Sequence, residues 1–208
     1  MIDPSRRHRT ASGFTLVELL VVIALIAILA LIGVPWMFGT LNRAKLVGAA
    51  KETATMMQLA RMEAIKYSVP TQVLYDTAAH HFIAFADLDR DGAFDPTKDR
   101  IVVTRYQLPK GVELWGPSDG ASEAANSIVG WDDAALCADA LPGPIFEPDG
   151  SANCRGSFRL RDQNGNFLEV RIEFPATARI SLRKWFGGGD PDANWFENGE
   201  QNNRWQWQ

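Results

Sequence analysis

The carboxylate of Glu18 stands at the head of a long apolar segment, where an unpaired charge is costly. The residues from Leu19 to Phe38 carry no charged side chain, and as a helix these 20 residues extend about 30 Å, enough to cross a hydrocarbon core. A carboxylate at the edge of such a span costs about 2 kcal/mol or more unless it is neutralised or paired. The presence of Glu18 therefore needs a chemical reason.

The segment before Glu18 is short and basic. Three arginines, Arg6, Arg7 and Arg9, precede the apolar residues, and positive charge favours the cytoplasmic side of a membrane. A cleaved secretory signal peptide fits poorly, because the apolar run exceeds the usual core of about 7–15 residues and no small-x-small site closes it. A plain signal anchor fits the length but leaves Glu18 unexplained.

A second group of carboxylates lies in a predicted loop. Its members are Asp87, Asp89, Asp91, Asp95 and Asp99. With Gly92, the first four follow the alternating spacing of an EF-hand loop, which wraps oxygen ligands around calcium, whereas Asp99 comes one residue after the last ligand position. Lys98 occupies the place of the bidentate acid, however, and no second EF-hand helix follows. The alternative is a solvated hairpin loop whose aspartates accept hydrogen bonds from turn amides, so calcium is a hypothesis and no cofactor is required.

A third group is basic and lies late in the chain. Residues 155–184 hold seven basic and three acidic side chains, in a chain of net charge −4. The arginines on one predicted strand face are Arg159, Arg161, Arg171, Arg179 and Arg183. Such a face could contact phosphates or a protein partner. Glu169 and Glu173 lie on the same face, however, and favour cross-strand ion pairs on a solvated sheet.

The sequence offers little support for catalysis. Its histidines are His8 near the amino terminus and the adjacent pair His80 and His81, which we expect on opposite sides of a strand. We find no Ser-His-Asp arrangement, paired-acid pocket or phosphate loop. The net charge of −4 also argues against a general nucleic-acid or membrane-surface polycation. We therefore do not expect an enzyme.

A long helix positions the first of these groups. Behind the apolar run, small or apolar side chains recur with the spacing of one helical stripe. They are Leu46, Ala50, Thr53, Met57, Ala60 and Ala64. Pro35 would kink the helix without ending it, whereas Pro70 ends it and makes Ser68 and Val69 extended. We expect one helix, half in a membrane and half packed on a globular domain.

Short strands separated by turns follow the helix. The predicted strands are 71–76, 81–86, 100–107, 112–115, 127–131, 144–147, 157–161, 167–174 and 178–184. The last three alternate apolar and polar side chains, which is typical of an antiparallel meander with one buried face. That face must pack on a second sheet or on the helix, so the predicted fold class is α+β.

The last segment of the chain combines two opposite tendencies. Glycines at 187–189 and several Asn and Asp residues give it the composition of a flexible segment. Its aromatic residues are Trp195, Phe196, Trp205 and Trp207. Exposed tryptophan clusters often mark partner surfaces, but the rings could equally fold back onto the domain. Both alternatives stay open.

The segment Gly13-Phe14-Thr15-Leu16-Val17-Glu18 resembles the class III signal of type IV pilins and type II secretion pseudopilins. The resemblance implies that a membrane-embedded prepilin peptidase cleaves after Gly13 and that the new amino-terminal Phe14 is N-methylated. It also implies that Glu18 pairs with the Phe14 ammonium of a neighbouring subunit. Two opposite charges removed from water together cost far less than either alone.

Later motifs narrow this resemblance. The segments 59–65, 85–92, 145–150 and 178–182 resemble motifs of the H-type minor pseudopilins and of the related FimT/FimU-type minor pilins. The resemblance covers about residues 14–184. The closing strand departs from the pattern, because it lacks the glycine that usually precedes its first arginine, and a long tail follows it.

The resemblance implies a minor pseudopilin, a structural subunit of the periplasmic pseudopilus of a type II secretion system, held in the bacterial inner membrane with its C-terminal domain in the periplasm. The implied partners are other minor pseudopilins, the major pseudopilin, the prepilin peptidase/N-methyltransferase and the inner-membrane assembly platform. The alternative is a FimT/FimU-like minor pilin of a type IV pilus. DNA-uptake pilins of the FimT type bind DNA through basic residues near the carboxy-terminal region that corresponds to residues 155–184 here. A membrane-anchored calcium-dependent adhesin is a third class, resting on the acidic loop and the tail alone.

The implied compartment also bears on the cysteines. In an oxidising periplasm Cys137 and Cys154 could form one disulfide worth about 3 kcal/mol, and the alternative is two unpaired small apolar residues. Their spacing suits neither a metal site nor a redox motif. The expected organisation is a leader (1–13), a transmembrane helix (14–38), its amphipathic continuation (39–69), a β domain (70–185) and a Gly/Asn/Trp-rich tail (186–208).

Overall fold

The computed structural model describes residues 14–117, 127–131, 133, 137 and 142–205, without the side chains of 32–38. The chain divides into two compact units, residues 1–39 and 40–208. The helix α1 (Leu16–Tyr67) contributes to both units. Within the described residues, no helix combines the length and apolar character that a membrane span requires.

The helix α1 begins with a side-chain cap. The backbone N–H of Glu18 donates a hydrogen bond to the Thr15 hydroxyl at 3.2 Å, so Thr15 caps the helix and Glu18 lies in its first turn. This cap satisfies an amide that has no partner inside the helix, and a carboxylate in the first turn interacts favourably with the helix dipole. Thr15 and Glu18 therefore stabilise the start of α1.

The second part of α1 buries the stripe that the sequence predicts. All six members are fully buried: Leu46, Ala50, Thr53, Met57, Ala60 and Ala64. Ala49 and Met56 widen the buried face, and the Thr53 hydroxyl donates to the Ala49 carbonyl oxygen at 3.0 Å, which lets a polar side chain lie in the core.

The helix ends at Tyr67, close to the predicted end, but the linker differs from the prediction. Ser68 has a φ of 55° and is left-handed, so the expectation that it is extended is wrong. The Val69 amide then donates to the Ala64 carbonyl oxygen at 3.3 Å. This bond satisfies one of the free carbonyls at the end of the helix, which is the physical reason for the turn at Ser68.

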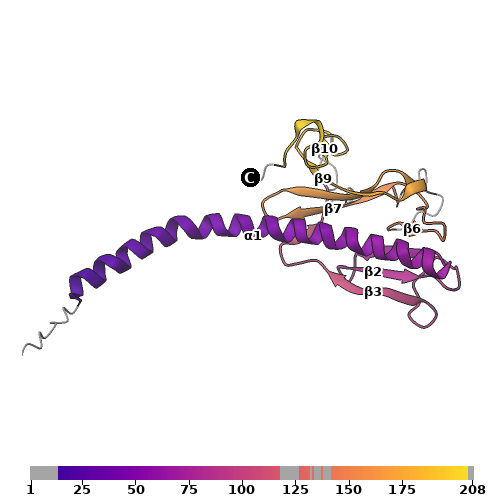
Figure 1. Ribbon diagram of the computed structural model, residues 1–208, viewed down its shortest axis with the longest axis horizontal. Helices are drawn as coiled ribbons and strands as arrows, with labels where there is room; N and C mark the ends of the chain where they lie inside the picture. Colours follow the sequence, from indigo (N-terminus) through magenta and orange to yellow (C-terminus); the bar gives the residue numbers. More distant parts are fainter. Residues whose placement is uncertain (1–13, 118–126, 132, 134–136, 138–141, 206–208) are drawn as a thin grey trace, which may run out of the picture. The chain divides into compact units, whose positions relative to one another are not determined.

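Two antiparallel sheets form the β domain (Figure 1). The first sheet has the strand order β3-β2-β1-β6, and the second has the order β10-β9-β8-β7-β4, with β5 also paired to β7. The strands of the first sheet are β1 (Thr71–Asp76), β2 (His81–Ala86), β3 (Arg100–Gln107) and β6 (Ile145–Phe146). Those of the second are β4 (Val112–Leu114), β5 (Ile128–Val129), β7 (Gly156–Asp162), β8 (Phe167–Ile172), β9 (Ile180–Trp185) and β10 (Trp195–Phe196). In the described part of the chain, short 3₁₀ turns lie at Pro175–Thr177 and Glu200–Asn202.

One hydrophobic core unites both sheets with the buried stripe of α1. The rings of Phe82 in β2 and Phe158 in β7 meet edge to face, with 5.0 Å between their centroids. The distance between the ring centroids of Trp131 and Phe158 is 4.7 Å. All three side chains are fully buried. The second sheet therefore packs on both candidates that the sequence left open, a sheet and a helix, and the α+β fold class is confirmed.

The tail (186–208) has the composition of a flexible segment, but part of it is a structured part of the β domain. Within the tail, β10 pairs antiparallel with β9, with Trp195 opposite Trp185 and Phe196 opposite Lys184. Trp195 is only 7% exposed, and Trp205 packs against the core. Of the two alternatives for the tail aromatics, these two rings fold back onto the domain, whereas Trp207 lies outside the described residues.

Candidate functional site

The amino-terminal signal is only partly within the described chain. Gly13 lies outside it, and Phe14 is 78% exposed just before the Thr15 cap. Glu18 is exposed in the first turn of α1. The described part of the signal is therefore exposed.

Residues 59–65 of α1, one of the motifs on which the family resemblance rests, contact the β domain through a hydrogen bond. The Arg61 Nε donates to the Gly150 carbonyl oxygen at 2.8 Å, and so joins two motifs on which the family resemblance rests. Gly150 has a φ of 85°, and a Cβ there would lie 2.9 Å from the Ile65 Cδ1 atom. These residues therefore hold the helix at a fixed place on the domain, and the turn at Gly150 requires glycine.

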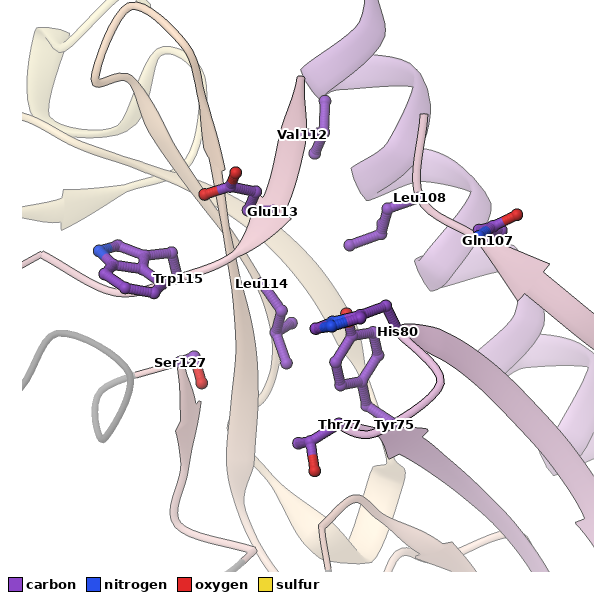
Figure 2. A pocket seen from close by; sticks show the side chains of 10 residues that line it. All are labelled: Tyr75, Thr77, His80, Gln107, Leu108, Val112, Glu113, Leu114, Trp115 and Ser127. Atoms are coloured by element: carbon purple, nitrogen blue, oxygen red, sulfur yellow. The ribbon is translucent and has the colours of Figure 1, made fainter. Parts of the chain in front are cut away.

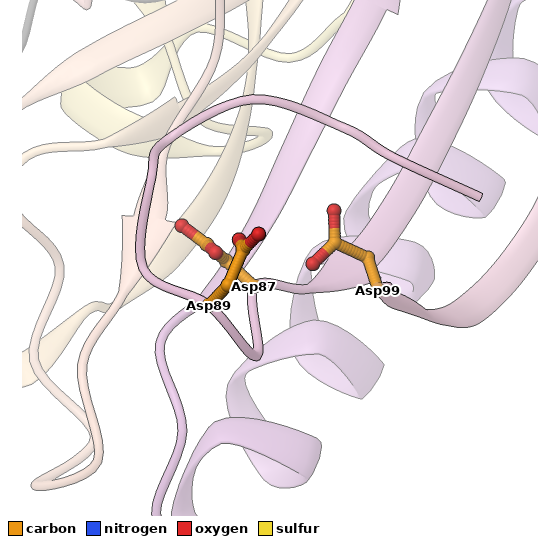
Figure 3. Close-up of side chains that lie close together, drawn as sticks. All are labelled: Asp87, Asp89 and Asp99. Atoms are coloured by element: carbon orange, nitrogen blue, oxygen red, sulfur yellow. The ribbon is translucent and has the colours of Figure 1, made fainter. Parts of the chain in front are cut away.

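The acidic loop connects β2 to β3, and three of its five aspartates come together (Figure 3). One carboxylate oxygen from each of Asp87, Asp89 and Asp99 lies within 4.8 Å of the others. Asp87 and Asp99 are buried, while Asp89 is exposed. Oxygen atoms at this spacing suit a hard cation such as calcium. Asp91 and Asp95 do not belong to this group.

Two of these aspartates also hold the loop together through hydrogen bonds to its backbone amides. Asp87 accepts hydrogen bonds from the amides of Asp91 and Gly92, at 3.3 and 2.9 Å. Asp99 accepts from the amides of Leu88 and Asp95, at 3.1 and 2.7 Å. This arrangement matches the turn-capping alternative that the sequence left open.

Lys98 supplies positive charge to this loop. Its ammonium lies 3.0 Å from Asp89 and 3.6 Å from Asp95. The hydrogen bond from Lys98 lowers the pKa of Asp89, while the Thr97 hydroxyl and amide, followed by Lys98, lower the pKa of Asp95. The residue that interrupts the EF-hand spacing therefore neutralises part of the charge that calcium would otherwise balance.

The arginines of the second sheet are paired, as Glu169 and Glu173 led us to expect. Arg159 lies directly opposite Glu169 across β7 and β8, with its Nε 3.5 Å from the Glu169 Oε2, and Arg171 lies 3.9 Å from the other oxygen. The other pairs are Arg161 with Glu113, Arg179 with Glu197, and Arg183 with Glu173.

The expectation that this face is solvated is wrong at its centre. Arg159 is 1% exposed and Glu169 is fully buried. The tail covers them: Asp192 accepts a hydrogen bond from the Arg159 Nη2 at 2.7 Å, and the Trp195 ring lies 4.9 Å from the guanidinium carbon. Because Arg159 is enclosed in this way, it cannot contact a phosphate at the surface, and the prediction of a nucleic-acid face loses its central residue.

Burial raises the pKa of the Glu169 carboxyl, and the guanidiniums of Arg171, Arg159 and Arg183 act in the opposite direction. Its ionised form therefore depends on the arginines around it. Sequence reasoning predicted the ion pairs but not the tail residues that cover Arg159. The covering residues, Asp192 and Trp195, supply an acid and an aromatic ring, which both suit a buried guanidinium.

The disulfide between Cys137 and Cys154 is confirmed, with 5.7 Å between the two Cα atoms. Cys154 lies close to the core residue Trp131, whose indole N–H donates to the Cys154 carbonyl oxygen at 3.3 Å. The disulfide therefore fixes the connection that enters β7.

The β domain also has a groove of about 570 Å³, which the sequence did not predict (Figure 2). It lies between the end of the β1–β2 hairpin and strand β4, with Tyr75, Leu108, Leu114 and Trp115 among its lining residues. His80 and Glu113 also line it, and the Glu113 carboxylate is bound to Arg161. The apolar members of this lining, such as Leu108 and Leu114, suit packing against apolar groups.

Two family models match the chain. The model for the type II transport protein GspH matches residues 49–175, more than half of the chain. The chain belongs to the GspH family. A second model, for the prokaryotic N-terminal methylation motif, matches residues 8–34. No curated protein and no solved structure matches the chain.

The two matches agree with the geometry and identify a minor pseudopilin of a type II secretion system with a type IV pilin-like fold. The alternative of a FimT/FimU-like pilin is not favoured. The GspH pseudopilin family is structural rather than enzymatic. Membership of this family implies assembly with other pilin-like subunits and processing by the prepilin peptidase, and the N-terminal motif indicates an inner-membrane anchor.

Proposed function

We propose that this minor pseudopilin is made as a prepilin, cleaved between Gly13 and Phe14 and N-methylated on Phe14. The methylation-motif match at residues 8–34 spans this junction and carries the proposal. The helix cap supports it, because Thr15 and Glu18 both lie on the mature side of the junction. Cleavage would therefore leave the start of α1 intact.

The cleaved chain would stay in the bacterial inner membrane through residues 14–38, with its C-terminal domain in the periplasm. The uncharged run from Leu19 to Phe38 and the arginines before it support this orientation. The Cys137–Cys154 disulfide is consistent with it, because such bonds persist in oxidising compartments.

Assembly would then pair the exposed Glu18 carboxylate with the Phe14 ammonium of a neighbouring subunit. Pairing neutralises both groups as helices leave the membrane together. The partners would be other minor pseudopilins, the major pseudopilin, the prepilin peptidase/N-methyltransferase and the inner-membrane assembly platform. The hydrogen bond from Arg61 to Gly150 would keep the β domain attached to the helix during assembly.

Intact-mass measurement of the chain isolated from its host tests the processing step. The wild type should start at a methylated Phe14, and Gly13→Val should keep its leader, because a branched side chain replaces the glycine beside the cleaved bond. Ser12→Ala is the matched control and should be processed normally. A Gly13→Val chain that still starts at Phe14 would contradict the assigned junction.

A further inference from the structure

The outer edge of β9 is covered along only part of its length. Strand β10 pairs with Lys184 and Trp185, and the tail then turns away at Gly199, which has a φ of 90° and donates its amide to the Asn203 carbonyl oxygen at 2.8 Å. In the part of the chain that the structure describes, no strand pairs with the remaining edge from Ile180 to Leu182. This region also lies beyond residues 49–175, which the GspH family model matches.

The backbone groups of this open edge point outward. Across β10, the Phe186 amide donates to the Asn194 carbonyl oxygen at 3.0 Å. Alternate residues of an antiparallel strand bond to opposite neighbours, so Leu182 and Ile180 present their N–H and C=O groups on the same side as Phe186. Neither makes a backbone hydrogen bond across that edge to any described residue.

A shallow groove of about 400 Å³ follows this edge, between β9 and the tail. Ile180, Leu182 and Trp205 supply apolar walls. Ser181 also lines the groove, is 8% exposed, and its hydroxyl has no hydrogen-bond partner among the described residues. The Ser181 hydroxyl can therefore bond to a polar group that enters the groove.

We propose that this edge of β9 receives an extended strand from a different subunit of the pseudopilus. The guest strand would continue the line of β10, run antiparallel to β9 and bond to the backbone groups of Leu182 and Ile180, as in other cases of strand addition. A serine or threonine would lie opposite Ser181, with apolar residues on either side of it. The proposal rests on the proposed function in assuming that neighbouring subunits exist.

Charge decides between a different subunit and a second copy of this chain. Two β9 edges paired around Ser181 would set Arg179 directly opposite Arg183 of the other copy, twice over, and like charges directly opposite destabilise a sheet. Within this chain Arg179 is paired with Glu197 at 3.1 Å and Arg183 is paired with Glu173. A second copy would crowd both pairs against their duplicates, whereas an uncharged guest leaves both pairs undisturbed. The fitting guest is an uncharged, alternating segment of another protein chain.

Photo-crosslinking in the secreting host tests the proposal with the full-length chain. A photoreactive residue replacing Arg179 should form an adduct with another pseudopilin, mapped by mass spectrometry to an extended segment. The same residue replacing Thr104, on the exposed edge strand β3, is the positional control and should not capture that segment.

Two variants in the crosslinking chain separate strand addition from simple proximity. Leu182→Pro removes one outward N–H, which an edge strand tolerates, and should lower the adduct about tenfold, whereas Leu182→Val should not. Ser181→Ala removes the unpaired hydroxyl; it should also lower the adduct while the melting temperature stays equal or rises. The proposal is overturned if the amount of adduct is unchanged in both Leu182→Pro and Ser181→Ala. It is also overturned if the residue at position 179 crosslinks only to a second copy of this chain or only to residues 206–208.

Incorporation of the wild-type chain into isolated pseudopili distinguishes two kinds of failure. If the chain is incorporated and no adduct with another subunit forms, only the strand-addition proposal fails. If the chain is absent from pseudopili, the proposed function fails with it.

Discussion

The buried guanidinium of Arg159 reaches across the second sheet to Asp192, a tail residue whose carboxylate oxygen lies 2.7 Å from its Nη2 atom. The same guanidinium contacts Glu169 on the neighbouring strand, so one arginine joins β7, β8 and the tail. The tail is therefore a structural part of the β domain, and it closes over charged groups that cannot be left unpaired.

Replacing Arg159 should destabilise the domain strongly. Arg159→Met leaves the fully buried Glu169 with Arg171 as its nearest cation, 3.9 Å away, and should cost about 3 kcal/mol of unfolding free energy. The double variant Arg159→Met/Glu169→Met removes both charges and should recover most of this loss. Urea denaturation of residues 40–208, the unit that contains the core, provides the measurement.

The matched control for this prediction is Arg179→Met. Arg179 is also paired with a tail carboxylate, Glu197, but its side chain is 64% exposed, and solvent screens the pair. Its loss should therefore cost less than about 1 kcal/mol. Equal costs for the two single variants would contradict the view that burial makes the Arg159 contacts important.

Local patterns predicted much of this fold. The stripe from Leu46 to Ala64 was predictable because helical spacing is a property of neighbouring residues. Strands β1 to β3 have the predicted bounds because turn residues separate them. The contact between Arg159 and Asp192 joins residues 33 positions apart, and the glycines at 187–189 indicated a flexible tail. No local pattern encodes such a contact.

The acidic loop should lose part of its stability in acid. The pKa of Asp89 and that of Asp95 are both lowered in the folded chain, so their contribution is present above the ordinary carboxyl pKa near 4 and is lost as the pH falls through the lowered values. The wild type should melt above Lys98→Met at pH 7, and the two melting temperatures should converge below about pH 3. A difference that persists at pH 2.5 would rule out Lys98 pairing as its source.

Calcium should bind this loop weakly, if the three gathered carboxylates form a cation site. Carboxylate oxygens of Asp87 and Asp99 already accept hydrogen bonds from backbone amides, and Lys98 already pairs with Asp89. Because calcium must compete with these contacts, a rise in melting temperature should need calcium in the millimolar range. Asp89→Asn should remove the rise, while Asp149→Asn, in a separate turn where Asp149 accepts a hydrogen bond from the Ser151 amide, should keep it. An unchanged wild-type melting temperature at 10 mM calcium would reject the site.

The role of Glu18 can be separated from its place in the helix cap. Its amide bonds to Thr15, and a first-turn carboxylate also favours the helix dipole, so Glu18→Ala changes both the helix and the charge. Glu18→Gln keeps a side chain that suits this position but removes the charge. If an ammonium pairs with Glu18, both variants should be cleaved normally and yet be depleted from pseudopili to a similar extent. Normal incorporation of Glu18→Gln would exclude charge pairing.

The most direct test of the central claim, that this chain is a minor pseudopilin of a type II secretion system, is a clean deletion in the native host. Release of secreted proteins should fall, complementation should restore it, and pilus-dependent motility and DNA uptake should remain intact. Normal secretion together with lost pili or lost DNA uptake would contradict the account and would instead indicate a subunit of a type IV pilus.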